Sequence, residues 1–286
     1  MDYINNFFKN IPNLDIAVYI EQALNYMVMN WGDLLAAMRS FVLFFVVRIE
    51  KVLQWLPWWV WLIIIFLVAA KLVSKKTGCI FAIMLFLVGW MGYWDLMVMT
   101  VAIVLTAIIF SLSIGIPFGI LMARNNLIEK IMHPILDAMQ TTPSFVYLLP
   151  AVMLFGLGKV PAVFASTIYA IPPIIRMTNL GIRNVSSTSI MVADSFGANA
   201  WQTLTKVQLP QAMTMIMAGI NQTTMMSLGM IITSSMVGAN GLGLAIFSAI
   251  GHLDVGTAFE AGVCIVFIAI ILDRITQGLA KKFGRE

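Results

Sequence analysis

The sequence predicts an all-α integral membrane protein with about seven transmembrane helices and an interfacial helix at the N-terminus. Two observations carry this prediction. Apolar residues make up 60% of the 286 residues and charged residues only 10%, whereas about 25% of residues are charged in soluble domains. The charged residues also leave long gaps at 96–123, 138–158 and 207–253. Each gap accommodates a membrane-spanning helix of about 20 apolar residues.

Residues 1–54 mix apolar and charged positions, which predicts one or two helices lying in the membrane interface. The apolar run from Leu34 to Val47 contains Arg39 and is short for a span, although a transmembrane position for it stays open as the alternative. Four tryptophans then resemble the aromatic belt at the edge of a membrane. They are Trp55, Trp58, Trp59 and Trp61.

Seven spans are expected within residues 55–280. Residues 55–92 contain two accessory spans, the first opening at Pro57 and the second running through 79–90. Residues 93–280 contain a core of five spans. The second core span is broken at Pro143, and a cytoplasmic approach helix at 127–140 precedes it. The five core spans begin at Trp94, Phe145, Val160, Gln211 and Gly256.

Positive charges indicate the orientation, because lysine and arginine mark the cytoplasmic ends of spans. Lys159 is the only basic residue in the short outer loops. The N-terminus is therefore expected outside and the C-terminus in the cytoplasm. If the segment 34–47 spanned the membrane, only the N-terminus would change sides. The basic residues at the expected inner ends are Lys71, Lys75, Lys76, Arg124, Arg176, Arg183, Lys281, Lys282 and Arg285.

One expected cytoplasmic segment, residues 186–210, is longer and more apolar than a simple connector. Residues 186–188 are candidates for a helix N-cap, and Gly197 suits the left-handed conformation that ends a helix. Asn199, with Gln202 three positions later, resembles a capping box. These signals predict a helix, a turn and a second helix. Such a hairpin either folds back on its own bundle or docks a cytoplasmic partner, and its apolar side chains favour docking.

This segment resembles the coupling motif of binding-protein-dependent ABC importer permeases, which reads E-A-A, three residues, G, nine residues, an apolar residue, then x-L-P. Aligned on Gly197, the chain has Met191, Val192 and Ala193 where the motif reads E-A-A, so the glutamate and the middle alanine are absent. Over residues 92–278 the chain resembles the permeases of glycine betaine and proline betaine uptake systems. The stretches that carry this resemblance are GYWD at 92–95, PILDAMQTTPSFVYLLP at 134–150, IPPIIRMTNLGI at 171–182, MAGINQTTM at 217–225, GLG at 241–243 and ILDRITQ at 271–277.

The resemblance implies a five-helix core of the MetI-like permease type, in one of two identical subunits that form a path across the bacterial cytoplasmic membrane. Two ABC ATPase subunits would bind beneath, and an external binding protein would deliver a quaternary ammonium substrate such as glycine betaine. Closure of the ATPases would push on residues 186–210 and rock the attached helices between inward- and outward-facing states. The implied coupling residues are Ala193, Asp194, Gly197, Ala198, Trp201, Val207, Leu209 and Pro210.

The chain lacks the G-x-x-x-x-G-K-[ST] loop that cradles phosphates, so the energy is expected to come from a partner and the chain is not expected to be an enzyme. His133 and His252 lie far apart in the sequence and away from acidic clusters, so no cofactor and no metal site are expected. The net charge is +4 and the basic residues form no cluster, so no surface that binds nucleic acid is expected.

An ion-coupled secondary transporter of a small polar solute is the alternative function. Such proteins place ionisable residues inside the membrane, where each costs about 2.5–3.5 kcal/mol on insertion scales. Here Glu260 lies about one turn inside the last span, which suits a position at the outer mouth. Asp273 and Arg274 lie towards the inner end, which suits an interfacial pair. The scarcity of such residues favours the ATP-driven hypothesis.

Uncharged polar residues are the candidates for the translocation path. One group surrounds the break at Pro143, because backbone carbonyls freed there are tolerated only against protein or a water-filled cavity. A second group lies on the fourth core helix. Hydrogen bonding between helices is the alternative role for each residue, and the two aromatic residues near the break are candidates for contact with a quaternary ammonium group. The path candidates are Thr141, Ser144, Phe145, Tyr147, Asn221, Thr224 and Ser227.

Two further patterns are expected to serve packing. Ser111, Gly115 and Gly119 are four residues apart and form a small-residue stripe suited to close helix contact. The 21 methionines are expected to supply adaptable packing between moving helices and not metal ligands.

Overall fold

The computed structural model describes residues 16–283, and that part of the chain consists of helices without any strand. The first 15 residues of the predicted N-terminal region, and Arg285 of the predicted inner basic set, lie outside the described residues. The helices are α2 (Ile16–Asn30), α3 (Gly32–Trp55), α4 (Trp58–Leu72), α5 (Lys75–Trp90), α6 (Trp94–Arg124), α7 (Asn126–Thr141), η1 (Ser144–Tyr147), α8 (Leu148–Phe155), α9 (Lys159–Arg183), α10 (Ser187–Ser195), α11 (Ala200–Thr203), η2 (Leu204–Gln208), α12 (Leu209–Ser234), η3 (Ser235–Val237), α13 (Leu242–Gly251) and α14 (Val255–Phe283).

Four of the described helices are long and apolar enough to cross a membrane: α6, α9, the continuous helix 200–237 and α14. Two bent pairs raise the number to six, namely α3 with α4, bent by 96°, and α7 with η1–α8, bent by 106°. The sequence predicted about seven. The difference lies in the two predicted accessory spans, which correspond to α4 and α5. These helices have 15 and 16 residues and so extend about 23 Å at 1.5 Å per residue. That is less than the roughly 30 Å of a hydrocarbon core.

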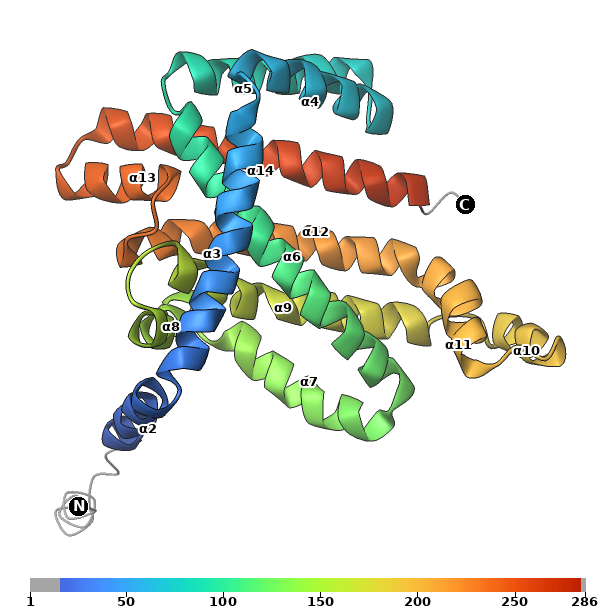
Figure 1. Cartoon of the computed structure of the whole chain (residues 1–286). Coiled ribbons are helices and arrows are strands. Elements are labelled where there is room, and N and C mark those ends of the chain that lie inside the picture. Colours follow the sequence, from blue (N-terminus) through green and yellow to red (C-terminus); the bar gives the residue numbers. More distant parts are fainter. Residues whose placement is uncertain (1–15, 284–286) are drawn as a thin grey trace, which may run out of the picture.

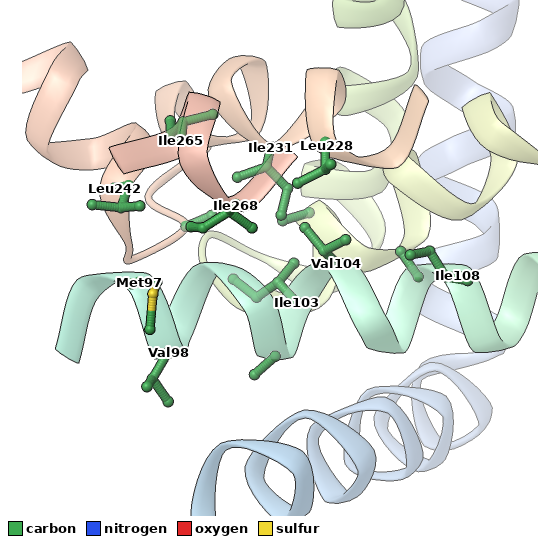
Figure 2. Packing of buried hydrophobic residues seen from close by; sticks show 14 of the residues in the cluster. Met97, Val98, Ile103, Val104, Ile108, Leu228, Ile231, Leu242, Ile265 and Ile268 are labelled. Atoms are coloured by element: carbon green, nitrogen blue, oxygen red, sulfur yellow. The ribbon is translucent and has the colours of Figure 1, made fainter. Parts of the chain in front are cut away.

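The centre of the molecule is formed by α6, α9 and α12, with α14 packed against α12 (Figure 1). Along α6, Ile103 and Val104 meet Leu228 and Ile231 of α12 and Ile268 of α14 (Figure 2). All five are buried. Lipid tails are as apolar as these side chains, so helix association in a membrane depends on close packing and not on the hydrophobic effect. The interdigitation in Figure 2 is therefore what holds the core together.

The predicted small-residue stripe is the closest contact between α6 and α9. Ser111, Gly115 and Gly119 are all buried, and the Ser111 hydroxyl donates to the Thr167 carbonyl at 3.2 Å. A Cβ atom on Gly119 would stand 2.6 Å from the Thr178 Cβ. A Cβ on Gly115 would stand 2.3 Å from the Cγ2 of Ile174 on α9. The two helices approach this closely only because these positions carry no side chain.

The predicted break at Pro143 is present, and local hydrogen bonds stabilise it. The chain is extended at Thr142 and Pro143 and then continues as the short helix η1. The Thr142 hydroxyl donates to the Ala138 carbonyl at 2.7 Å, and the Tyr147 hydroxyl donates to the Met139 carbonyl at 2.7 Å. The bond from Tyr147 satisfies the Met139 carbonyl, which lacks an N–H partner because residue 143 is proline, whereas the Thr142 hydroxyl reinforces a carbonyl that already accepts from the Thr142 N–H at 3.0 Å.

The N-terminal helix α3 is attached to the outside of the core by an ion pair and by aromatic contacts. Lys159, the first residue of α9, pairs with Glu50 of α3 at 2.6 Å, with side chains that are 21% and 13% exposed. Phe41 and Phe45 pack against Phe110 of α6 at centroid distances of 5.9 and 5.4 Å. The basic residue that the sequence analysis assigned to an outer loop is thus neutralised by a carboxylate 109 positions away.

Helix α13 is an element that the sequence analysis did not expect. It runs beside the first part of α14 in the opposite direction (Figure 1). The Leu242 N–H donates to the Thr100 hydroxyl at 2.8 Å. The turn into α14 is capped by Asp254, which accepts from the Thr257 hydroxyl at 2.7 Å and from its N–H at 3.1 Å. These bonds from Thr257 hold the pKa of the Asp254 carboxyl below its usual range.

Candidate coupling hairpin and transport groove

Residues 186–210 form the predicted helix–turn–helix, which we call the hairpin, at one end of the molecule (Figure 1). Its first helix, α10, follows Ser186, whose side chain makes no capping hydrogen bond. The second helix continues from α11 through η2 into α12 without interruption. Pro210 lies directly after η2 within this continuous helix, where its missing N–H leaves one backbone hydrogen bond unmade. The hairpin is therefore directly continuous with a core helix.

Two caps lock the turn of the hairpin. Gly197 has a positive φ of 77°, its N–H donates to the Asp194 carbonyl at 2.9 Å, and the Ala198 N–H donates to the Ala193 carbonyl at 3.0 Å. This is a Schellman motif, for which glycine is preferred. Asn199 then accepts from the Trp201 and Gln202 N–H groups, and the Gln202 side chain accepts from the Asn199 N–H at 2.9 Å. Four of the predicted coupling residues, 193, 194, 197 and 198, thus specify the shape of the turn.

The tip of the hairpin exposes a cluster of apolar side chains. Phe196 is 88% exposed and Trp201 is 67% exposed, and Met191 and Val192 on α10 are exposed as well. Of these four residues the sequence analysis selected Trp201 for coupling, and Phe196 is among the apolar side chains of the segment that favoured docking. The signal for the others was available, because no lipid contact is expected for apolar residues in a cytoplasmic segment. Exposed apolar patches rimmed by polar residues mark contact sites for a partner.

The base of the hairpin is buried in the core. Leu204 is 1% exposed and packs with Ile182, Ala212 and Ile216. Arg124, the last residue of α6, donates from Nη2 to the Ala200 carbonyl at 2.6 Å. The other predicted coupling residues lie near this base, where Val207 and Leu209 are half-buried and Pro210 is exposed.

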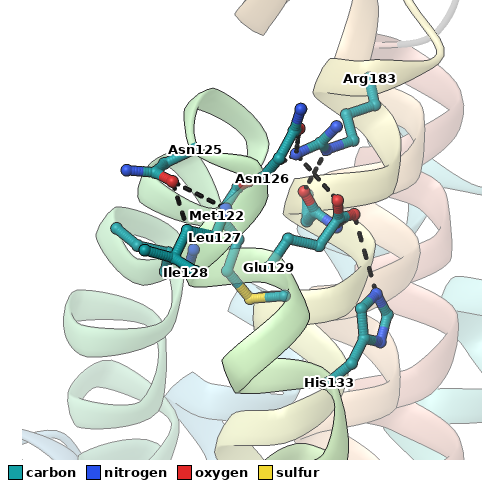
Figure 3. A network of polar contacts seen from close by, with 9 residues as sticks. Met122, Asn125, Asn126, Leu127, Ile128, Glu129, His133 and Arg183 are labelled. Atoms are coloured by element: carbon teal, nitrogen blue, oxygen red, sulfur yellow. Dashed lines mark hydrogen bonds and ion pairs between the residues drawn. The ribbon is translucent and has the colours of Figure 1, made fainter.

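A polar network joins three helices beside the hairpin base (Figure 3). Arg183 of α9 pairs with Glu129 of α7 at 2.9 Å and donates to the Met122 carbonyl of α6 at 2.9 Å. Glu129 also accepts from Asn179 at 3.0 Å and lies 3.7 Å from His133. An additional ion pair, between Arg176 and Asp137, connects α9 to α7. The ends of α6, α7 and α9 near the hairpin therefore behave as one body.

We expect Arg183→Met to lower the free energy of unfolding by about 2 kcal/mol, because hydrogen bonds to charged groups contribute about 1.5–3 kcal/mol. Glu129→Gln in the same chain should recover part of this loss, since no carboxylate is then left without its cation. Unfolding midpoints of the purified single and double variants form the double-mutant cycle. Lys130→Met removes an exposed cation next to Glu129 and is the control. Equal losses for Arg183→Met and Lys130→Met would contradict the network.

The predicted path residues separate into two environments. A cavity of about 390 Å³, which we call the groove, lies where the broken helix meets α9 and the middle of α12. Ser144 lines it, whereas Phe145 is exposed beside it. The ring of Tyr147 stands 6.2 Å from the ring of Tyr169. The groove is lined by Ser144, Tyr169, Gln222, Met225, Met226, Gly229 and Met230.

Of the remaining path candidates, Thr141, Asn221 and Thr224 are hydrogen-bonded within the protein, whereas the Ser227 hydroxyl has no partner. Thr141 is exposed and donates to carbonyls of its own helix. Asn221 donates to Asp273 of α14 at 3.0 Å, and Thr224 donates to the Ile220 carbonyl at 2.8 Å. Ser227 is fully buried. The groove is lined by the neighbouring face of α12, at 222, 225, 226 and 229. The assignment of Asn221, Thr224 and Ser227 to the path stays a prediction.

The ionisable residues considered for ion coupling are bound to polar neighbours. Glu260 accepts from the Tyr93 hydroxyl at 3.2 Å. Asp273 accepts from Asn221 and, at 2.9 Å, from Gln277. Within residues 16–283, no group of three or more histidine, cysteine, aspartate or glutamate side chains could hold a metal ion.

A bundle of long apolar helices, with a rigid hairpin at one end and an uncharged groove halfway along α12, defines a transport subunit. The chain belongs to the family of binding-protein-dependent transport system inner membrane components, whose model matches residues 115–285. This confirms the predicted permease class. The chain is accordingly a permease subunit and not an enzyme, since in this family the ATPase is a separate subunit.

Relatives match almost the whole chain. The glycine betaine/carnitine transport permease protein GbuB of Listeria monocytogenes is 44% identical over 283 residues, which cover 97% of this chain and 99% of the relative. The glycine betaine/proline betaine transport system permease protein ProW of Escherichia coli is 42% identical over 278 residues, which cover 97% of this chain and 78% of the relative. Among solved structures, an inward-facing MetNI methionine ABC transporter has a TM-score of 0.60 at 20% identity, covering 65% of this chain and 93% of that one. This likeness confirms the MetI-like fold.

Proposed function

We propose that the chain forms the translocation path of an ATP-driven importer of quaternary ammonium osmoprotectants of the glycine betaine and proline betaine type. The observation that carries the proposal is the 44% and 42% identity, over 97% of the chain, to permeases named for glycine betaine. Family membership favours an ATPase partner over coupling to an ion gradient. The polar partners of Glu260 and Asp273 point in the same direction.

In this proposal the hairpin transmits the work of the ATPase. Phe196 and Trp201 enter a pocket on the ATPase, and the two caps keep the turn rigid under load. The contact of Arg124 with Ala200 and the burial of Leu204 pass the movement to α6 and α12. Domain-level switches of this kind amplify small shifts because packed helices move as rigid bodies.

The proposed assembly contains two copies of this chain, two ATPase subunits and an extracytoplasmic binding protein. A second copy is supported by the groove, which is open along one side where Phe145 and Met225 are exposed. The proposed orientation puts the hairpin in the cytoplasm of a bacterium and the N-terminus outside. It is supported by the basic residues Arg124, Arg183, Lys281 and Lys282, because α14 ends at the same side of the molecule as the hairpin (Figure 1).

Uptake by proteoliposomes tests this function. Vesicles containing the chain, its ATPase and its binding protein should accumulate labelled glycine betaine only when ATP is present on the hairpin side. A proton or sodium gradient without ATP should give no accumulation. Accumulation driven by a gradient, in vesicles that lack the ATPase, would overturn the proposal in favour of a secondary transporter.

A further inference from the structure

The groove combines aromatic, thioether and neutral polar groups, and no side chain lining it is charged at neutral pH. Tyr169 comes from α9, Ser144 from η1, and Gln222 with Met225, Met226 and Met230 from α12. Its volume of about 390 Å³ is within the range of small-molecule sites, about 300–1,000 Å³. A site without a fixed charge suits a ligand without net charge, because an uncompensated ion is costly to hold away from water.

The polar groups of the groove are available to a ligand. Between Ile16 and Phe283, neither the Ser144 hydroxyl nor the Gln222 amide has a side-chain hydrogen bond to another protein group, whereas the neighbouring Asn221, Thr223 and Thr224 are all engaged. Gln222 supplies two N–H donors and Ser144 one O–H donor. A carboxylate, which only accepts hydrogen bonds, is the complementary group.

A quaternary ammonium group is a cation that cannot donate hydrogen bonds, so it needs a different partner, and Tyr169 supplies one. A quaternary ammonium group is attracted to the face of a tyrosine ring. The ring of Tyr147 stands 6.2 Å from that of Tyr169, tilted by 56°, and its hydroxyl is fixed on the Met139 carbonyl at the helix break. Tyr147 is therefore a positioning residue that supports the orientation of Tyr169. Three methionines complete a soft, polarisable wall.

We propose that the groove is the permease's own substrate site, which binds a zwitterion with its quaternary ammonium group on Tyr169 and its carboxylate on Gln222 and Ser144. This inference rests on the proposed function and adds a selectivity to it. A solute with a net positive charge, such as choline, lacks the carboxylate and leaves its charge uncompensated in the groove. The permease therefore moves betaines faster than choline, even when the binding protein delivers both.

Uptake by the full complex in proteoliposomes tests the site, with labelled glycine betaine as the probe. Tyr169→Leu should reduce the maximal uptake rate at least tenfold while the half-saturating concentration of loaded binding protein and the ATPase activity that it stimulates stay within twofold. Tyr169→Phe keeps the ring face and should stay within twofold of the unmodified chain. Thr178→Val, at a buried position of α9 outside the groove, is the matched control. Full uptake by Tyr169→Leu, or equal losses for the Leu and Phe variants, would overturn the site.

A second variant tests the other end of the ligand. Gln222→Glu introduces a negative charge where the carboxylate is bound, so we expect the ratio of glycine betaine to choline uptake to fall at least tenfold when one binding protein delivers both solutes. An unchanged ratio would overturn the assignment of Gln222. If the unmodified complex fails to take up glycine betaine with ATP, the proposed function fails and not the site alone. If the unmodified complex transports glycine betaine with ATP, and Tyr169→Leu and Gln222→Glu behave as it does, only the proposed site is wrong.

Discussion

Replacing Phe196 and Trp201 together by aspartate is expected to reduce ATP-driven uptake at least a hundredfold. Both side chains are exposed at the hairpin tip, 88% and 67%, so the change removes little packing within the chain. Large aromatic residues at the centre of an interface commonly contribute 2 kcal/mol or more each, and about 2.7 kcal/mol already corresponds to a factor of one hundred. Two carboxylates would in addition have to be desolvated in an apolar pocket.

The measurement is ATP-driven uptake alongside the yield and oligomeric state of the purified variant. Phe196→Leu combined with Trp201→Phe keeps the apolar surface and is the matched control, for which we expect a loss of no more than about tenfold. Yield and oligomeric state should be unchanged in both variants. Normal uptake by the variant with both aspartates would show that the hairpin tip does not bind the ATPase.

Gly119→Val is expected to prevent the core from packing. A Cβ at this position would lie 2.6 Å from the Thr178 Cβ and 2.8 Å from the Ile175 carbonyl oxygen. The second contact is with backbone, which cannot rotate away as a side chain can. Overpacking in a well-packed core costs about 1–3 kcal/mol and sometimes more, and valine adds two methyl groups to the clash. We expect the free energy of unfolding to fall by about 3 kcal/mol or more and the yield of folded protein to be strongly reduced.

The apparent unfolding midpoint in detergent, together with the yield, measures this loss. Gly262→Ala on α14 is the control, because no atom lies within 4 Å of its Cβ position. That variant should stay within about 0.5 kcal/mol of the original chain, as surface substitutions usually do. An unaltered midpoint for Gly119→Val would mean that α6 and α9 do not meet at the small-residue stripe.

Local signals were readable from the sequence because their physics is local. The left-handed φ of Gly197 and the capping box of Asn199 involve atoms within a few residues of one another. The break at Pro143 follows from a missing N–H and a fixed φ. The stripe from Ser111 to Gly119 could be read because a spacing of four residues defines one helix face.

Features that depend on tertiary contacts were not readable in this way. The pairing of Lys159 with Glu50 joins residues 109 positions apart, and no periodicity encodes it. Helix α13 is only ten residues long, so its apolar run could equally belong to a loop between spans. The groove face of α12 is set by the partners of Asn221 and Thr224, which lie on α14 and on the helix itself. Without these contacts, spacing alone could not distinguish Gln222 from Asn221.

Site-specific crosslinking tests the central claim, that the hairpin is the docking element for an ATPase, most directly. In a background with Cys79→Ser and Cys264→Ser, Phe196→Cys should form a crosslink to the ATPase subunit in the assembled complex. Val255→Cys is similarly accessible, at 79% exposed, and is the first residue of α14. Helix α14 begins at the opposite end of the molecule from the hairpin (Figure 1), so this variant should form none. Crosslinks from Val255→Cys, with none from Phe196→Cys, would contradict the account.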